Sequence, residues 1–399
     1  MIRRLAATLT AALLLAGCAT AEEAPDPLGM PERPTPAAHP PGLIGEAEDA
    51  GVTPEGAAVR LFRYASRDAR GGPMEVSGAA FIPAEPAEGP RPLLVLAPGT
   101  WGMADRCAPS ANVAGGGIPD RARHFTALGW TVVQTDYQGL GTPGLHTYMV
   151  RAAQAHAVLD IVAAAVQLDP ALGDRPPTAI AGYSQGGGAA AAAAELQPEY
   201  APDLDLRAVD ASAVPADLVE VTRGVDESPL SGVVGYAING MVAAYPELAG
   251  PVGAAVNDEG RAFLAEVRDQ CLDDTGAAFG FRSSTELTAD GRTMAEHLTD
   301  PGFERLLAEQ RIGDRTPAAP VIMAHNVTDA VVPFGQARDL ARTWCAAGAA
   351  VRFLTVDESV GPMESHGVAD ARTRAERDGF LYHAVVGDAP IAPANCGDL

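Results

Sequence analysis

The chain has 399 residues and a formal net charge of −23 at pH 7. This length allows one large domain or two smaller ones. The strong negative charge disfavours nucleic acid and anionic membrane surfaces as electrostatic partners. After the N-terminus, no stretch of the sequence is apolar for long enough to span a bilayer.

The N-terminus has the pattern of an export signal. Two arginines, Arg3 and Arg4, precede an apolar stretch over residues 5–16, and Leu15-Ala16-Gly17-Cys18 follows the pattern of a bacterial lipobox. This pattern predicts a lipoprotein-type signal peptide over residues 1–18 and lipidation of Cys18, which would anchor the protein to a membrane. The alternative is an ordinary signal peptide cut after Ala21. Both alternatives predict an exported protein, either a cell-surface lipoprotein or a secreted one.

Residues 19–45 are rich in Pro, Ala and Glu, which predicts a semi-extended spacer. Beyond Cys18 the chain has four cysteines, an even number, which in an oxidising compartment favours disulfide bonds over free thiols. Four cysteines allow three pairings, and the residues alone do not choose among them. The four are Cys107, Cys271, Cys345 and Cys396.

After the spacer, strand-like and helix-like segments alternate, which predicts an α/β fold with a mostly parallel sheet flanked by helices. Expected strands cover residues 58–65, 74–82, 93–97, 129–135, 177–181, 320–324 and 351–356. Expected helices cover residues 120–128, 147–168, 188–196 and 335–346. The predicted core is therefore formed by residues 46–214 and 316–399.

The alternation stops over residues 215–315, where the segments are helical at 230–245, 258–272 and 301–310. A helical block inserted between two sheet strands predicts a cap over an active site. The alternative is a peripheral insertion that does not contact the site.

The most informative motif is Gly182-Tyr183-Ser184-Gln185-Gly186-Gly187, a Gly-x-Ser-x-Gly pattern between an expected strand and an expected helix. This context is typical of the nucleophile elbow of α/β hydrolases, in which a strained turn exposes the serine hydroxyl. It predicts Ser184 as a catalytic nucleophile.

A serine nucleophile needs a base and an acid, which follow the serine in α/β hydrolases in the order acid, then histidine. Asp329 is the predicted acid because it follows the strand at 320–324; Asp357 and Asp339 are its rivals. His366 is the predicted base, expected in a Gly/Pro-rich loop after the last strand. The remaining histidines are expected to be structural, and His325 supports the assignment of the Asp329 loop.

An oxyanion hole needs two N–H groups that converge on one point. One is expected from Gln185, the residue after the nucleophile. The other is expected from the loop after the strand at 93–97, where Thr100 is preferred and Gly99 is the alternative.

Taken in order, these motifs resemble the secretory lipase family of α/β hydrolases. The resemblance covers roughly residues 50–396 and is carried by the segments at 96–100, 105–110, 136–144 and 182–187 together with the Asp329 and His366 loops. The most specific of these segments is Asp-Tyr-x-Gly-Leu-Gly at 136–141.

The resemblance implies a Ser184–His366–Asp329 triad, a lid formed by the helical insertion, and disulfides Cys107–Cys271 and Cys345–Cys396. The chain departs from the family pattern at two places where relatives often have His-Gly. These are Pro98-Gly99 and His325-Asn326.

The sequence therefore predicts an exported serine ester hydrolase, a lipase or carboxylesterase, acting on a small-molecule ester or a lipid without metal or cofactor. One alternative is an acyltransferase or peptidase that uses the same triad. Another is a non-catalytic relative that binds a ligand at the cell surface.

Overall fold

The computed structural model describes residues 26–31, 34, 38–85, 91–387 and 389–399. The predicted signal peptide, Cys18 and the first part of the predicted spacer lie outside the described residues. Within them, the first strand already begins at Ile44, inside the predicted spacer. None of the helices in the described ranges is both long and apolar enough to cross a membrane.

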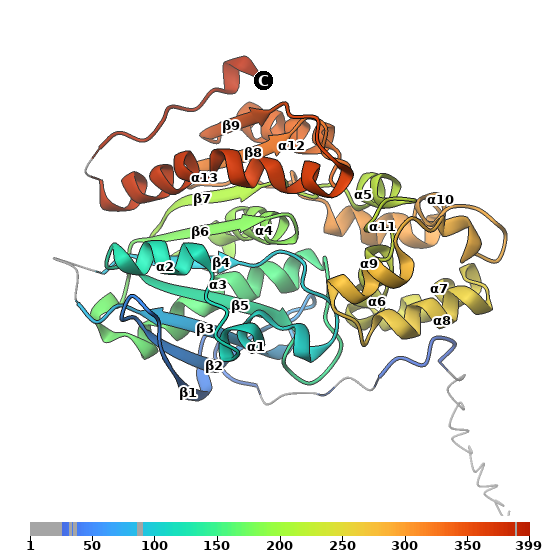
Figure 1. Cartoon of the computed structure of the whole chain (residues 1–399), viewed down its shortest axis with the longest axis horizontal. Coiled ribbons are helices and arrows are strands. Elements are labelled where there is room, and N and C mark those ends of the chain that lie inside the picture. Colours follow the sequence, from blue (N-terminus) through green and yellow to red (C-terminus); the bar gives the residue numbers. More distant parts are fainter. Residues whose placement is uncertain (1–25, 32–33, 35–37, 86–90, 388) are drawn as a thin grey trace, which may run out of the picture.

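A nine-stranded sheet runs through the centre of the molecule in the order β1-β2-β3-β5-β4-β6-β7-β8-β9 (Figure 1). β1, β2, β3 and β5 pair antiparallel, and all pairings from β5 to β9 are parallel. The fold is thus the expected α/β-hydrolase fold with a mostly parallel sheet. The strands are β1 (Ile44–Val52), β2 (Ala58–Arg67), β3 (Pro73–Ile82), β4 (Leu93–Ala97), β5 (Thr131–Gln138), β6 (Thr178–Tyr183), β7 (Leu206–Ser212), β8 (Val321–Asn326) and β9 (Val351–Val356).

Helices cover both faces of this sheet, and alternate strand residues supply the two cores. In β4, every residue of which is buried, Leu93 and Val95 join one core while Leu94 and Leu96 join the other. The first core packs against α3 (Arg151–Leu168), α4 (Gln185–Tyr200) and α12 (Phe334–Ala346). The second packs against α1 (Pro109–Ala114), α2 (Asp120–Ala127) and α13 (Pro362–Val386).

The segment between β7 and β8 forms a helical cap with its own apolar core, at the right of Figure 1. Three loops that follow parallel strands contact it. After β4, Trp101 and Met103 make backbone hydrogen bonds to residues 270–272. After β5 and β8, Tyr148 and Val331 join the cap core. The cap helices are α5 (Leu218–Val225), α6 (Val233–Ala244), α7 (Ala249–Ala255), α8 (Asp258–Val267), α9 (Leu272–Phe279), α10 (Met294–His297) and α11 (Pro301–Gln310).

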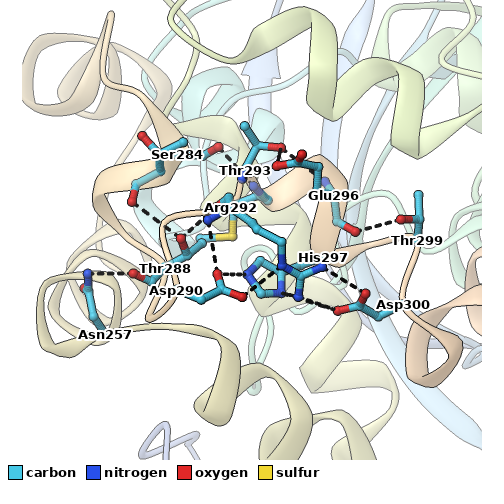
Figure 2. Close-up of polar contacts among 12 residues, drawn as sticks. Asn257, Ser284, Thr288, Asp290, Arg292, Thr293, Glu296, His297, Thr299 and Asp300 are labelled. Carbon is cyan, nitrogen blue, oxygen red and sulfur yellow. Dashed lines mark hydrogen bonds and ion pairs between the residues drawn. The ribbon is translucent and has the colours of Figure 1, made fainter.

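Charged side chains form a network of polar contacts in the segment of the cap between α9 and α11 (Figure 2). The guanidinium of Arg292 donates to both carboxylate oxygens of Asp300 at 2.9 and 3.0 Å and to Asp290 at 2.8 Å. His297 lies between these groups, with Nε2 3.0 Å from Asp290 Oδ1. These contacts link the two ends of the segment at residues 290–300.

Two disulfides are present, Cys107–Cys271 and Cys345–Cys396. This is the pairing that the family resemblance implies. The first joins the segment after β4 to the cap, and the second joins α12 to the C-terminal segment.

The predicted elements differ from the structure in a few places. The strands β1 and β7 and the helices α1, α5, α7, α9 and α10 were not expected from the sequence. The expected helix at 147–168 begins instead at Arg151, because Met149 has a positive φ of 62° that a helix cannot contain.

Candidate active site

Ser184 occupies a strained turn between β6 and α4. Its φ is 61° and its ψ is −123°, a combination that costs energy for any residue with a side chain. Neighbouring glycines make this turn possible because there is no room for side chains around it. A Cβ atom at Gly182 would lie 2.0 Å from the carbonyl oxygen of Gly186, and one at Gly186 would lie 2.0 Å from that of Ala97.

The structure brings Ser184, His366 and Asp329 together in one chain of hydrogen bonds. His366 Nε2 lies 2.8 Å from Ser184 Oγ, and His366 Nδ1 lies 2.8 Å from Asp329 Oδ2. Ser184 is half-buried and the carboxylate of Asp329 is fully buried. This arrangement can move a proton from the serine hydroxyl to the imidazole while the carboxylate stabilises the resulting positive charge.

Asp329 is held as a carboxylate by four donors. Its Oδ1 accepts from the backbone N–H groups of Val331 and Val332 at 2.9 and 3.0 Å. Its Oδ2 faces His366 and also His325, whose Nε2 lies 3.3 Å away. Burial by itself raises the pKa of Asp329, but the hydrogen bonds from His325 and His366 outweigh burial and hold that pKa well below its ordinary value. Asp329 is therefore ionised at neutral pH, and Nδ1 of His366 is the donor in their contact.

The expected loop position of His366 is wrong, because His366 lies near the start of α13. Pro362 occupies the first position of this helix, where the missing N–H of proline costs nothing. The Gly361-Pro362 pair thus marks a helix start rather than a continuing loop. The rigid helix, rather than a flexible connection, sets the direction of the His366 ring.

Asn326, where relatives often have glycine, joins the Asp329 loop to the segment that carries His366. Its side-chain amide donates to the carbonyl oxygens of Glu358 and Ser365 at 3.1 and 3.0 Å, and its Oδ1 accepts from the N–H of Glu358 at 3.1 Å. Ser365 adds a contact of its own, since its hydroxyl accepts from the N–H of Ala330 at 3.1 Å. No local motif in the sequence indicates this role, and its one signal is the departure from the family pattern.

The loop expected to complete an oxyanion hole lies beside the elbow. A Cβ atom at Gly99 would lie 3.5 Å from the carbonyl oxygen of Tyr183. Thr100 is half-buried, and its hydroxyl lies 2.7 Å from that of Tyr148. Gln185 is the first residue of α4, where backbone N–H groups have no partner within the helix, and its side chain is buried.

The rival acids have other environments. Asp339 is on α12, where it pairs with Arg342, and Asp357 follows β9. His325 is fully buried in β8, and its single Nε2–H is shared between the carbonyl oxygen of Val332 at 2.9 Å and Asp329 Oδ2 at 3.3 Å. His325 thus contacts the loop that carries Asp329.

Known proteins share both the sequence pattern and the fold. A family model described as secretory lipase matches residues 124–371. A secreted triacylglycerol lipase of Malassezia globosa is 31% identical over 56% of the chain and 47% of its own length. The chain thus spans about half the length of this relative. A Mycobacterium tuberculosis protein named "probable inactive lipase" is 26% identical over 78% of the chain and 72% of its own length.

Solved structures show the same fold. The structure of Candida antarctica lipase A in its closed state superposes with a TM-score of 0.79 at 20% identity, covering 93% of this chain and 89% of that one. A rice cell wall degrading esterase from Xanthomonas oryzae superposes with a TM-score of 0.73 at 22% identity, covering 87% of this chain and all of that one (100%). At these identities the similarity concerns the fold alone.

Proposed function

The chain belongs to the secretory lipase family, and on that premise we propose that it is an exported serine hydrolase that cleaves acyl or lipid esters. The observation that carries this proposal is the hydrogen-bonded chain from Ser184 through His366 to Asp329 at a strained elbow. Export is supported by the N-terminal sequence pattern and by relatives named as secreted lipases. Lipidation of Cys18 is part of the proposal and rests on the sequence pattern alone.

In the proposed reaction, Ser184 Oγ attacks the ester carbonyl carbon while its proton passes to His366 Nε2. The carboxylate of Asp329 stabilises the imidazolium, and the N–H groups of Gln185 and Thr100 bind the negatively charged oxygen. His366 then gives its proton to the departing alcohol, which leaves an acyl-enzyme. Water, deprotonated by His366, attacks this acyl-enzyme, and the carboxylic acid is released as Ser184 regains its proton.

An acyl ester as substrate is supported by relatives named as triacylglycerol lipases. The cap also contains a cavity lined almost entirely by apolar side chains, with Thr222 and His297 as the polar ones, and none of Ser184, His366 and Asp329 lines it. Such a lining suits an alkyl chain and offers little to a peptide backbone. The apolar side chains include Val234, Ile238 and Met241 of α6 and Phe303 and Leu306 of α11.

The test compares hydrolysis of a triacylglycerol emulsion, a short soluble p-nitrophenyl ester and an aminoacyl amide by the wild-type protein and by S184A. We expect turnover of one or both esters, little turnover of the amide, and a loss of at least about 10⁴-fold in S184A with its fold intact. Faster cleavage of the amide would favour a peptidase. Release of a transfer product when an alcohol is added, in place of free acid, would favour an acyltransferase.

A protein without catalytic activity is the second candidate, because one relative is named a "probable inactive lipase". The intact contacts among Ser184, His366 and Asp329 argue against it here. Equal and negligible ester turnover by the wild-type protein and S184A, for all the substrates above, would favour this second candidate.

A further inference from the structure

His146 lies next to the proposed oxyanion hole and has no part in the proton transfer described above. It is fully buried, and its Nδ1 lies 2.9 Å from the carbonyl oxygen of Gln138. Since a carbonyl oxygen can only accept, Nδ1 carries the proton and Nε2 has a free lone pair. That Nε2 lies 3.2 Å from the side-chain amide nitrogen of Gln185, which donates to it.

Burial keeps His146 in this protonation state. It lowers the pKa of His146 to about 4, more than the hydrogen bond to Gln138 raises it. The ring of Tyr137 stacks on His146 with ring centroids 6.1 Å apart, and that of Tyr148 meets it edge-on at 5.8 Å. The imidazole is therefore a fixed acceptor for the Gln185 amide at neutral pH.

The segment that contains His146 also contacts the loop of Thr100, on the other side of the proposed oxyanion hole. The Tyr148 hydroxyl lies 2.7 Å from Thr100 Oγ1, and the Tyr137 hydroxyl donates to the carbonyl oxygen of Pro98 at 2.9 Å. The loop that carries Thr100 is thus held by Tyr137 in β5 and by Tyr148 in the segment between β5 and α3. Residues 137–148 therefore contact both sides of the proposed oxyanion hole, Gln185 on one side and the loop of Thr100 on the other.

The cap rests on this stretch. The ring of Tyr236 on α6 meets that of Tyr148 edge-on at 5.7 Å. The same helix packs so closely on Tyr148 that there is no space for a side chain at Gly240, where a Cβ atom would lie 2.5 Å from the backbone nitrogen of Tyr148. The side chain of Tyr148 therefore contacts both the cap and Thr100.

We propose that His146 and Tyr148 are positioning residues of the oxyanion hole, His146 through Gln185 and Tyr148 through Thr100. This inference rests on the proposed function. The N–H groups of an oxyanion hole bind the charge that develops in the transition state more strongly than they bind the substrate. Loss of their alignment should therefore lower kcat and leave KM nearly unchanged.

The experiment compares H146L, which removes the acceptor, with H146Q, in which an amide oxygen can replace it, and with Y148F, which removes one hydroxyl. H156L is the matched control. His156 is another buried histidine whose Nδ1 contacts a carbonyl oxygen, at 3.0 Å from that of Arg67, but it packs on Tyr200. Tyr200 is at the opposite end of α4 from Gln185, roughly 22 Å away at 1.5 Å per residue.

With p-nitrophenyl butyrate as substrate, we expect kcat to fall about 10- to 100-fold in H146L and Y148F, with KM within about two-fold of wild type. H146Q should recover most of the loss, and H156L should keep the wild-type kcat. Thermal unfolding of each variant shows whether it is folded at the assay temperature.

A wild-type kcat in Y148F would overturn the role of Tyr148, and equal losses in H146L and H156L would overturn that of His146. If H146L does not fold, H146Q and Y148F still decide, since a KM increase with constant kcat in either contradicts the proposal. A wild-type protein that turns over no ester and does not react with a fluorophosphonate would contradict the proposed function instead.

Discussion

The direction of each hydrogen bond decides what the buried polar side chains of the site can do. Asp329 accepts from four groups and so remains charged, whereas His146 donates from Nδ1 and so must accept at Nε2. The partners of Asp329 keep it ionised against the effect of burial, whereas burial itself keeps His146 neutral. The pKa values of both groups are lowered, but Asp329 is a carboxylic acid and His146 is an imidazole. The two groups therefore titrate in different pH ranges.

His146 should make the folded state less stable in acid. Its folded-state pKa of about 4 lies below the ordinary value of 6.5, so the unfolded chain binds more protons between these values. The stabilisation is complete above pH 6.5 and is lost as pH falls toward 4. Between pH 7.5 and pH 5, the free energy of unfolding of the wild type should fall by about 2 kcal/mol relative to H146Q.

Urea unfolding of both proteins at the two pH values measures this difference, and groups that titrate in both proteins cancel. An equal change with pH in the wild type and in H146Q would contradict the assigned protonation state.

The residues that perform the proposed chemistry could be predicted from the sequence because the reaction needs these side chains in this order. Ser184 lies at the expected turn between a strand and a helix, and Asp329 lies in the expected loop after β8. His366 follows β9 as expected, although it lies in a helix. Asn326 and His146 could not be predicted. Each acts through contacts with residues far along the chain, Ser365 and Gln185 respectively, and such contacts leave no local pattern.

At the scale of helices and strands, close packing between backbones fixes the elbow. α4 begins directly after Ser184 and passes so close to β4 and β7 that Cβ atoms would clash at Gly186 and Gly187, each 2.0 Å from a carbonyl oxygen. Backbone atoms cannot shift without moving the strands themselves. The glycines of the motif are thus required by packing as well as by the turn.

Replacement of Gly186 by alanine should therefore destabilise the protein by at least about 2 kcal/mol. G379A is the matched control, because Gly379 lies inside α13 with no atom within 4 Å of an added Cβ. That substitution should stabilise the protein by roughly 0.5–1 kcal/mol through helix propensity. Denaturant unfolding measures both, and equal stability of G186A and G379A would contradict the packing account.

Elements with continuous apolar runs, such as β4 and β8, could be predicted from the sequence. β7 could not, because Asp210 interrupts its apolar pattern. The structure explains how a buried strand tolerates this charge. Arg121 of α2 and Arg377 of α13 each place a guanidinium nitrogen 2.6 Å from Asp210 Oδ2. The start of α13 could not be predicted either, because it carries a Gly-Pro pair that is typical of loops.

At the scale of the whole molecule, the cap is joined to the core at the loops that surround Ser184. The Cys107–Cys271 disulfide links the segment after β4 to the cap, close to the backbone bonds of Trp101 and Met103. That an insertion exists over residues 215–315 could be predicted from the interrupted alternation. Its limits and its role as a lid stay predictions, since short helices broken by Gly and Pro give weak signals.

The two disulfides offer a matched pair of variants. Removing either one, by C107A/C271A or C345A/C396A, should cost about 2–5 kcal/mol of stability. Only the first should also lower kcat/KM, by on the order of 10-fold, because it aligns the loop next to Thr100 with the cap. Ester hydrolysis well below each variant's unfolding temperature tests this, and similar kcat/KM values for both double variants would argue against coupling between cap and site.

In the proposed mechanism Ser184 is a nucleophile activated by His366 and Asp329, and covalent capture of that serine tests this most directly. The wild-type protein is treated with a fluorophosphonate, and the adduct is located by mass spectrometry while ester turnover is followed. We predict one adduct per chain on Ser184, loss of turnover in step with labelling, and labelling slowed at least about 10³-fold in H366A. Ester turnover that persists in fully labelled protein, or an adduct on another residue, would contradict the account.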